Sequence, residues 1–305
     1  MGARSADGIG WVINFKDASI RFRVNSSRPN QRKDLHKFHA RQGGVAALPT
    51  LTISVMAKHR FYIPPTEWNL DDLRLPEEEA HHCSEVVRCR IGDRIICFNG
   101  EGVEAEAEVL SISRKQVDLK PLLVSETDRP PAEITLGQAI PKGKNMDLII
   151  QKATELGVSS IVPLLSERTV VQLDAEDLEK KRSKWQRVAI EACKQCGQNW
   201  LPTVLAPVSV DVFTRKYSNS FRIVAAISPE AQPLRRILED WDEENPERPK
   251  SAALMIGPEG DFTPAEISTA RAAGFAPLSL GPIILRSETA AIHAVSIVGY
   301  ELMGH

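Results

Sequence analysis

Two patterns of apolar residues follow one another along the chain. From Lys58 to about Pro121, short runs of alternating apolar and polar residues are separated by turn signals, as is typical of β-strands. The Asn99-Gly100 pair predicts a tight hairpin, and residues 77–89 predict one helix. The predicted strands are Arg60–Ile63, Asp93–Phe98, Glu104–Ile112 and Gln116–Leu119. We expect this part to fold as a small β-barrel.

From Ile134 onwards, predicted strands alternate with predicted helices. Met146, Ile149, Ile150, Ala153 and Leu156 share one face of a helix that Gly157 ends. The other helices lie around Trp185 and over Thr289–Met303, and the strands are Ile134–Ile140, Ser160–Leu165, Arg222–Ile227, Ala252–Ile256 and Pro277–Leu280. This alternation predicts an α/β domain with a parallel sheet covered on both faces.

Turn-forming residues separate the two patterns. Asp128-Arg129-Pro130-Pro131 has the composition of a linker. We therefore expect the barrel at residues 56–124, a linker at 125–132 and the α/β domain at 133–305.

Charge sets the first 55 residues apart from the rest. They carry nine Lys and Arg against three Asp, a net charge of +6, whereas the remainder carries −8. Residues 28–44 are polar and basic without a sustained period, so we expect a disordered basic extension over 1–55. Three explanations compete: an upstream start codon chosen in error, with Met56 as the true first residue, a basic RNA-binding arm, or an organelle transit peptide.

Composition narrows the class of protein. Five cysteines, an odd number spread irregularly, do not form a disulfide framework and fit a reducing compartment. No run of 18 apolar residues indicates a membrane span, and no apolar stretch after the first charges indicates a secretory signal. We expect a cytoplasmic protein without a membrane partner.

The stretch Leu254–Glu266 carries the first candidate site. An apolar strand runs into Gly257-Pro258-Glu259-Gly260, and Thr263 and Glu266 form a capping box around Pro264 at the next helix start. Glycines let the backbone approach a ligand, and the carboxyl ends of parallel strands are where α/β sheets bind ligands. A plain strand-to-helix turn has the same local pattern.

The stretch Leu280–Ala290 is a second loop that leaves a strand. Gly281-Pro282 makes a sharp turn, and Arg286, Glu288 and Thr289 cluster at the start of a helix. An arginine there can hold a phosphate or stabilise an anion, while the glutamate can accept a proton or hold the arginine. Helix capping with a local ion pair is the alternative.

These two loops resemble those of the SPOUT class of RNA methyltransferases. The similarity is closest to ribosomal RNA small subunit methyltransferase E, the uracil-N3 methyltransferase family, and extends over residues 59–300. The matching segments are Arg60–Ile63, His82, Val86–Arg88, Gly92-Asp93, Phe98–Gly102, Lys142–Lys144 with Met146, Gln151–Gly157, Ser166–Arg168, Glu191-Ala192 and both loops.

The resemblance implies an N-terminal PUA-like RNA-binding barrel and a C-terminal SPOUT domain with a deep trefoil knot. It implies an enzyme that uses S-adenosylmethionine to methylate N3 of a specific uridine in 16S ribosomal RNA of the small subunit, and a homodimer. A non-catalytic RNA-binding or ribosome-assembly factor on the same fold is the alternative. Carried over by position, the cofactor-binding residues are Leu254, Ile256, Gly257, Glu259, Gly260, Leu280, Gly281, Leu285, Arg286 and Ser287.

Uracil N3 carries a proton, so its methylation needs a base, a group that stabilises the resulting anion, or both. We expect Arg286 to stabilise that anion or to anchor the flanking phosphate, with Glu288 orienting Arg286 and Glu259 near the cofactor. No base is identifiable. Gln198 stands where relatives commonly have a basic residue, and Ser287 stands where threonine is frequent.

The RNA-binding residues must be local, because a core of net charge −8 repels a polyanion at long range. Arg60 with Phe61 and Tyr62 pairs charge with aromatic faces. The full set of RNA candidates is Arg60, Phe61, Tyr62, Arg88, Arg90, Arg94, Lys142, Lys144 and Arg168.

The sequence gives no evidence for a metal-binding or a dinucleotide- or nucleotide-binding function. Cys193-x-x-Cys196 lies in a helical pattern with no second pair of ligands, so we expect no metal. The chain also has no G-x-G-x-x-G after a strand and no P-loop.

Overall fold

The computed structural model describes residues 13–14, 19–20, 59–113, 115–143, 145–169, 175–218 and 220–304. The chain divides into two units between Ser54 and Val55. In the first unit, β1 (Ile13–Asn14) and β2 (Ser19–Ile20) pair antiparallel. The rest of the expected extension lies outside the described residues.

A five-stranded sheet forms the first half of the second unit. Its order is β3-β5-β6-β7-β4, and only the β3–β5 pair is parallel. Phe61, Ile95, Cys97 and Val109 are among the residues of its apolar core. The strands are β3 (Arg60–Tyr62), β4 (Arg74–Leu75), β5 (Arg94–Phe98), β6 (Val103–Ile112) and β7 (Val117–Glu126).

The predicted hairpin at Asn99-Gly100 is confirmed. The side-chain oxygen of Asn99 accepts hydrogen bonds from the backbone amides of Glu101 and Val103, at 2.8 and 3.1 Å. Gly100 and Gly102 have positive φ angles of 78° and 91°. The turn thus uses two glycines in a backbone conformation that other residues rarely adopt.

The single helix predicted over 77–89 is wrong in its detail. After a short turn η1 (Pro65–Glu67), the helix α1 (Glu77–His81) continues as one π-helical turn, η2 (His82–Val87). The turn ends at Arg88, whose φ of 60° is left-handed. π-Turns interrupt helices with little sequence signature, and a left-handed residue stops the helix.

A seven-stranded parallel sheet forms the second half of the unit, as the alternating pattern predicts. The order is β10-β9-β8-β13-β12-β14, and β11 also pairs with β9. The strands are β8 (Glu133–Ala139), β9 (Ser160–Leu165), β10 (Thr203–Val204), β11 (Val208–Ser209), β12 (Phe221–Ala225), β13 (Ser251–Ile256) and β14 (Ala276–Leu278).

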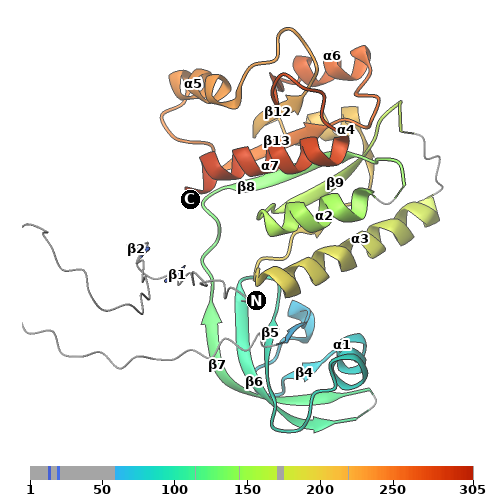
Figure 1. Cartoon of the computed structure of the whole chain (residues 1–305), viewed down its shortest axis with the longest axis vertical. Coiled ribbons are helices and arrows are strands. Elements are labelled where there is room, and N and C mark those ends of the chain that lie inside the picture. Colours follow the sequence, from blue (N-terminus) through green and yellow to red (C-terminus); the bar gives the residue numbers. More distant parts are fainter. Residues whose placement is uncertain are drawn as a thin grey trace, which may run out of the picture. The chain divides into compact units, whose positions relative to one another are not determined.

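Helices cover both faces of this sheet (Figure 1). One core packs residues of α2, α3, α5 and α7 on the sheet, and another packs α4 and α6 on the opposite face. The helices are α2 (Asn145–Glu155), α3 (Ala175–Cys196), α4 (Val210–Lys216), α5 (Leu234–Glu244), α6 (Pro264–Ala272) and α7 (Ser287–Met303). In the described part of the chain, no helix combines the length and apolarity needed to cross a membrane.

Candidate functional site

A cavity of about 420 Å³ lies at the carboxyl ends of three neighbouring strands, β12, β13 and β14. Its walls come from the segment after β12, the β13 loop (residues 257–263), the β14 loop (residues 279–286) and the first turns of α7. Parallel strands bring their carboxyl ends to one edge, where α/β sheets bind ligands. The volume suits a small-molecule site.

The β13 loop ends in the capping box that the sequence predicts. The hydroxyl of Thr263 accepts from the amide of Glu266 at 3.3 Å, and the carboxylate of Glu266 accepts from the amide of Thr263 at 2.8 Å. Asp261 has a φ of 59°, and its Oδ1 accepts from the amide of Phe262 at 2.8 Å. The amide of Asp261 donates to the carbonyl of Pro258 at 2.9 Å, which closes the turn, and Gly257 and Gly260 line the cavity.

One serine joins the two loops. The hydroxyl of Ser287 donates to the carbonyl oxygen of Gly257 at 2.7 Å and accepts from Nε2 of Gln138 at 3.0 Å. Gln138 is fully buried at the end of β8, and its Nε2 also donates to the carbonyl of Ala139. A buried polar group that loses its hydrogen bond destabilises the protein. The hydrogen bonds from Gln138 to Ser287 and from Ser287 to Gly257 therefore hold the two loops at a fixed separation.

Most of the predicted cofactor residues come together in this cavity. Its lining includes Ile256, Gly257, Glu259, Gly260, Leu280, Gly281, Leu285 and Ser287. Leu254 is outside the lining, and its side chain lies in the apolar core two residues before the strand end, so its predicted cofactor contact stays a prediction. Arg286 is not part of the lining; it immediately precedes α7 with its side chain exposed.

Sequence reasoning missed a third wall of the cavity. Ala225, Ala226, Ile227, Ser228 and Ala231 line it from the segment after β12. Their sequence carries no glycine-rich motif. Only the strand order, with β12 between β13 and β14, brings them to the site.

The cavity lining is acidic. Glu259 and Asp261 line it, and no lysine or arginine is among the described residues that do so. Oε1 of Glu259 accepts from the backbone amide of Lys142 at 3.0 Å, which brings the exposed Lys142 to the rim of the site. A cationic group is thus favoured inside the cavity and an anion at its rim.

The expected pairing of Glu288 with Arg286 is wrong. Within the described ranges, no ion pair or hydrogen bond joins the two side chains, and Glu288 instead accepts from Nδ2 of Asn145 at 3.4 Å. Arg286 is the extended N-cap residue before α7, whereas Glu288 lies in the first turn of the helix. The guanidinium of Arg286 is left exposed at the start of α7.

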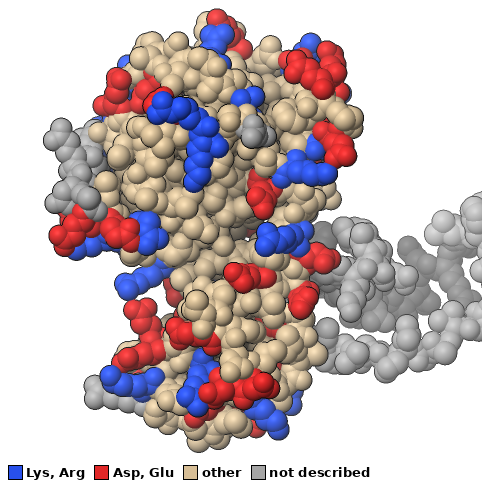
Figure 2. Space-filling view, turned by 180° about the vertical axis from the view of Figure 1, so that it is seen from behind, with Lys and Arg blue, Asp and Glu red and all other residues tan. Residues whose placement is uncertain are grey.

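The surface charges are mixed. Figure 2 shows a face on which basic and acidic side chains are interspersed and neither sign forms a continuous patch. Arg88 and Arg90 are exposed at the end of η2, and the exposed Arg94 lies 3.4 Å from Glu106. Lys144 lies outside the described residues. Arg168, also predicted to bind RNA, lies in the loop after β9 and donates from Nη1 to the carbonyl oxygen of Gly260.

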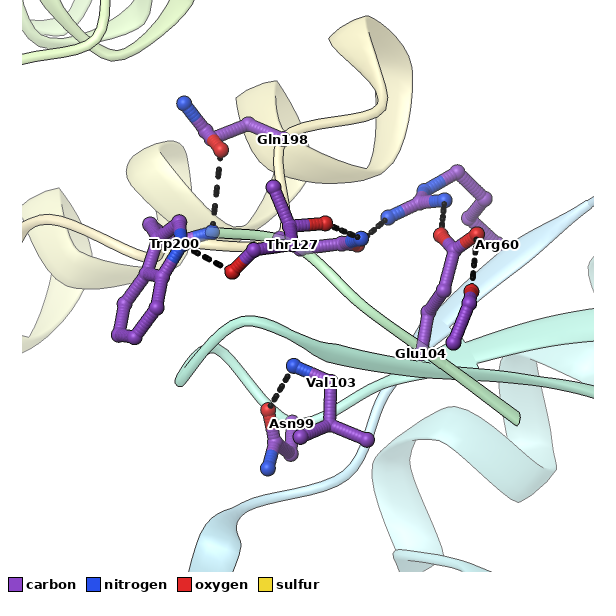
Figure 3. A network of polar contacts seen from close by, with 9 residues as sticks. Arg60, Asn99, Val103, Glu104, Thr127, Gln198 and Trp200 are labelled. Carbon is purple, nitrogen blue, oxygen red and sulfur yellow. Dashed lines mark hydrogen bonds and ion pairs between the residues drawn. The ribbon is translucent and has the colours of Figure 1, made fainter. Parts of the chain in front are cut away.

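The predicted aromatic RNA surface at β3 is wrong for Phe61, and the structure bonds Arg60 within the protein. Phe61 is 0% exposed in the core of the first sheet, so no base can stack on it. The side chain of Arg60 is 13% exposed and donates to Glu104 at 2.7 Å and to Asn199 at 2.6 Å (Figure 3). Tyr62 is half-buried and packs on Phe98.

This Arg60 network joins the two halves of the second unit. Asn199, from the loop after α3, donates to the hydroxyl of Thr127 at 2.9 Å, and the indole of Trp200 donates to the carbonyl of Thr127 at 3.1 Å (Figure 3). The side chain of Gln198 accepts from the amide of Trp200 at 3.1 Å. Gln198 therefore shapes this contact between the halves.

The described residues contain no group of three or more His, Cys, Asp or Glu side chains that could hold a metal ion. Cys193 is buried and Cys196 is exposed. Burial raises the pKa of the Cys193 thiol to about 12, which disfavours the thiolate that a metal would require.

Comparison with known proteins gives the family. Residues 128–299 match the model of an RNA methyltransferase domain, and residues 75–122 match that of an RNA methyltransferase PUA domain. Ribosomal RNA small subunit methyltransferase E of Bacillus subtilis is 32% identical over 79% of this chain and 96% of the relative.

Solved structures agree. The Neisseria gonorrhoeae methyltransferase E bound to S-adenosyl methionine is 33% identical, with a TM-score of 0.71 over 80% of this chain and 98% of that one. A Legionella pneumophila methyltransferase in complex with the same cofactor is 37% identical, with a TM-score of 0.72 over 80% of this chain and 98% of that one. This chain belongs to the ribosomal RNA small subunit methyltransferase E family.

Proposed function

We propose that this protein uses S-adenosylmethionine to methylate N3 of one uridine in 16S ribosomal RNA of the small subunit. The observation that carries the proposal is the acidic cavity between the β13 and β14 loops, in a chain whose relatives are named for this ribosomal RNA. Two loops tied by Ser287 and Gly257 form a preorganised site.

The cavity fits this cofactor. Ile256, Leu280, Leu285 and Ala290 supply apolar walls for a purine ring, and Glu259 and Asp261 supply negative charge for a sulfonium and an ammonium group. Gly281 has a φ of 112°, and a Cβ atom there would meet nothing within 4 Å, which leaves its backbone open to a ligand. When bound, the cofactor supplies an electrophilic methyl group.

Arg286 is the residue we assign to the substrate. Arg286 is exposed and stands in the sequence between Leu285 and Ser287, both of which line the cavity, so we infer that its guanidinium can reach a base placed at the cavity mouth. Loss of the N3 proton leaves negative charge on O2 and O4, which a guanidinium stabilises. The target base leaves its stack to reach the site. No side chain is assigned as the base, and Glu288 stays with Asn145.

RNA docking is assigned to Arg88, Arg90 and Arg94 on the PUA domain and to Lys142 at the rim. All four are exposed, and only Arg94 has an acidic partner among the described contacts of their side chains. Binding through such phosphate contacts weakens steeply with salt.

We further propose the trefoil knot, a homodimer and a cytoplasmic location. Support for the knot is that β14 lies beyond β12 while α7, which follows it, returns to contact β8 and β13. Support for a dimer is that Ile283, Ile284 and Tyr300 are exposed on the β14 loop and α7.

Calorimetric titration with S-adenosylmethionine separates the enzyme from an assembly factor on the same fold. The enzyme binds with a defined stoichiometry, whereas absence of binding favours the assembly factor. Arg286→Ala should bind the cofactor normally and lose methylation. Methylation by Arg286→Ala at the wild-type rate would remove Arg286 from the mechanism.

A further inference from the structure

The loop after β9 is bonded to the β13 loop although the two lie about a hundred residues apart in the chain. Glu266 is only 8% exposed. It accepts from the amide of Thr263 within its own capping box, and also from the amide of Glu167 at 2.9 Å and the hydroxyl of Ser166 at 3.4 Å. One buried carboxylate therefore belongs to two loops.

Arg168 makes the second tie. Its Nη1 donates to the carbonyl oxygen of Gly260, and its Cδ lies 3.5 Å from the position that a Cβ on Gly260 would occupy. The Arg168 side chain thus packs on Gly260 in the middle of the β13 loop, the residue between Glu259 and Asp261 of the cavity wall.

The segment that makes these ties is itself held in a compact turn. The amide of Thr169 donates to the carbonyl of Ser166 at 2.9 Å, and the hydroxyl of Thr169 accepts from the amide of Ser166 at 3.1 Å. The hydroxyl of Ser166 also accepts from the amide of Arg168 at 3.3 Å. Ser166–Thr169 is therefore a compact turn at the end of β9 that can hold the β13 loop in a fixed position relative to this strand.

The β13 loop is then fixed along its length. Ser287 holds Gly257 at its start, Arg168 holds Gly260 in the middle, and Glu266 holds Thr263 at its end. Ligand binding costs less free energy when the loop that contacts the ligand is already ordered.

We propose that Ser166–Thr169 is a brace, a segment that holds the β13 loop in the position in which it binds S-adenosylmethionine. Arg168 and Glu266 are then positioning residues for this cofactor. This assignment rests on the proposed position of the cofactor. It takes Arg168 away from the RNA surface, where its charge alone would place it. Removal of the brace weakens cofactor binding and leaves RNA binding intact.

The test uses the full chain with Arg168→Met, which keeps the aliphatic stem and removes the donors. The expected result is a rise of about five- to tenfold in the dissociation constant for S-adenosylmethionine, as loss of one hydrogen bond gives. The KM for the cofactor should rise in parallel, while kcat at saturating cofactor and the affinity for ribosomal RNA stay within about twofold. Arg215→Met, which removes an exposed arginine bonded to Asp211 on α4, is the matched control and should change none of these.

Glu266→Gln provides a second variant. It replaces one accepting carboxylate oxygen by an NH2 group, which then faces a donor and cannot accept its hydrogen bond. Its effect on cofactor binding should combine with that of Arg168→Met less than additively, since both residues hold the same loop. An unchanged cofactor affinity in Arg168→Met overturns the brace, and a loss of RNA affinity alone returns Arg168 to the RNA surface. Failure of the wild-type chain to bind the cofactor would instead overturn the proposed function, and the brace with it.

Discussion

The hydroxyl of Ser287 at the start of α7 donates a 2.7 Å hydrogen bond to the carbonyl oxygen of Gly257 at the end of β13. Gly257 begins the β13 loop and Ser287 directly follows the β14 loop, so this hydrogen bond links two of the walls of the cavity. Gln138 fixes the serine from behind. The site thus depends on a buried hydroxyl that is bonded both to the β13 loop and to a buried side chain of β8.

Ser287→Ala should weaken cofactor binding. The variant leaves the carbonyl of Gly257 and one hydrogen of the buried Gln138 amide without partners, a cost of about 1–3 kcal/mol. Part of that cost should appear as a higher dissociation constant in calorimetric titration with S-adenosylmethionine. Ser287→Thr keeps the hydroxyl and is the control. Equal affinity of the alanine and threonine variants would show that the tie has no part in binding.

Reversal of Arg88 and Arg90 to glutamate should lower the affinity for ribosomal RNA and reduce its dependence on salt. Both side chains are exposed, so the thermal midpoint should not change. The measurement is RNA binding at several salt concentrations. Affinity retained by the double variant would argue against the PUA domain as the docking surface.

Phe61→Ala is the contrasting variant at the same domain. Phe61 is fully buried, so its truncation should cost about 3–5 kcal/mol of stability. Any loss of RNA binding should follow the fraction of unfolded protein. RNA affinity that falls while the melting curve is unchanged would restore Phe61 as an RNA contact.

Gly102→Ala should disrupt the contact between the two halves of the second unit. Its Cβ would lie 2.5 Å from the ring of Trp200, at a φ of 91°. Gly197→Ala is the control, because φ is 81° there and nothing lies within 4 Å. The control measures backbone strain of about 1 kcal/mol, and Gly102→Ala should cost about 1–3 kcal/mol more in denaturant unfolding. Similar losses in the two variants would mean that Trp200 moves aside freely.

Alkylation should distinguish the two cysteines at the end of α3. Burial raises the pKa of Cys193 to about 12, so at pH 8 on the order of one thiol in ten thousand is ionised. Iodoacetamide should label the exposed Cys196 and leave Cys193 unlabelled, with labelling of Cys193 rising as pH rises toward its pKa. Peptide mass spectrometry gives the result. Equal labelling at pH 8 would show that this end of α3 opens.

The sequence predicts correctly the elements that depend on hydrogen bonds between near neighbours in the chain. The cap at Thr263 and Glu266 and the hairpin at Asn99 depend on residues within four positions of each other, and both are confirmed. Three residues are too few to show which side of a strand faces the core. In β3, alternation sets Phe61 against Arg60 and Tyr62, but only the packing of β3 against β5 and α3 determines that Phe61 lies inside.

Interruptions and long-range contacts set the other differences. The sequence predicts a strand that ends at Leu119, yet β7 continues to Glu126, because Pro121 lies where the β6–β7 register shifts. Proline is tolerated at such a bulge. Arg168 looked like a surface charge because its partner, Gly260, lies far along the chain.

Mapping of methylated uridines in small-subunit ribosomal RNA tests the central claim most directly. RNA from cells with and without the gene for this chain is digested and analysed by mass spectrometry. The proposed function predicts that one uridine of 16S ribosomal RNA loses a methyl group on N3 in the deletion, and that purified protein with S-adenosylmethionine restores it. An identical set of methylated uridines in both RNAs would contradict it.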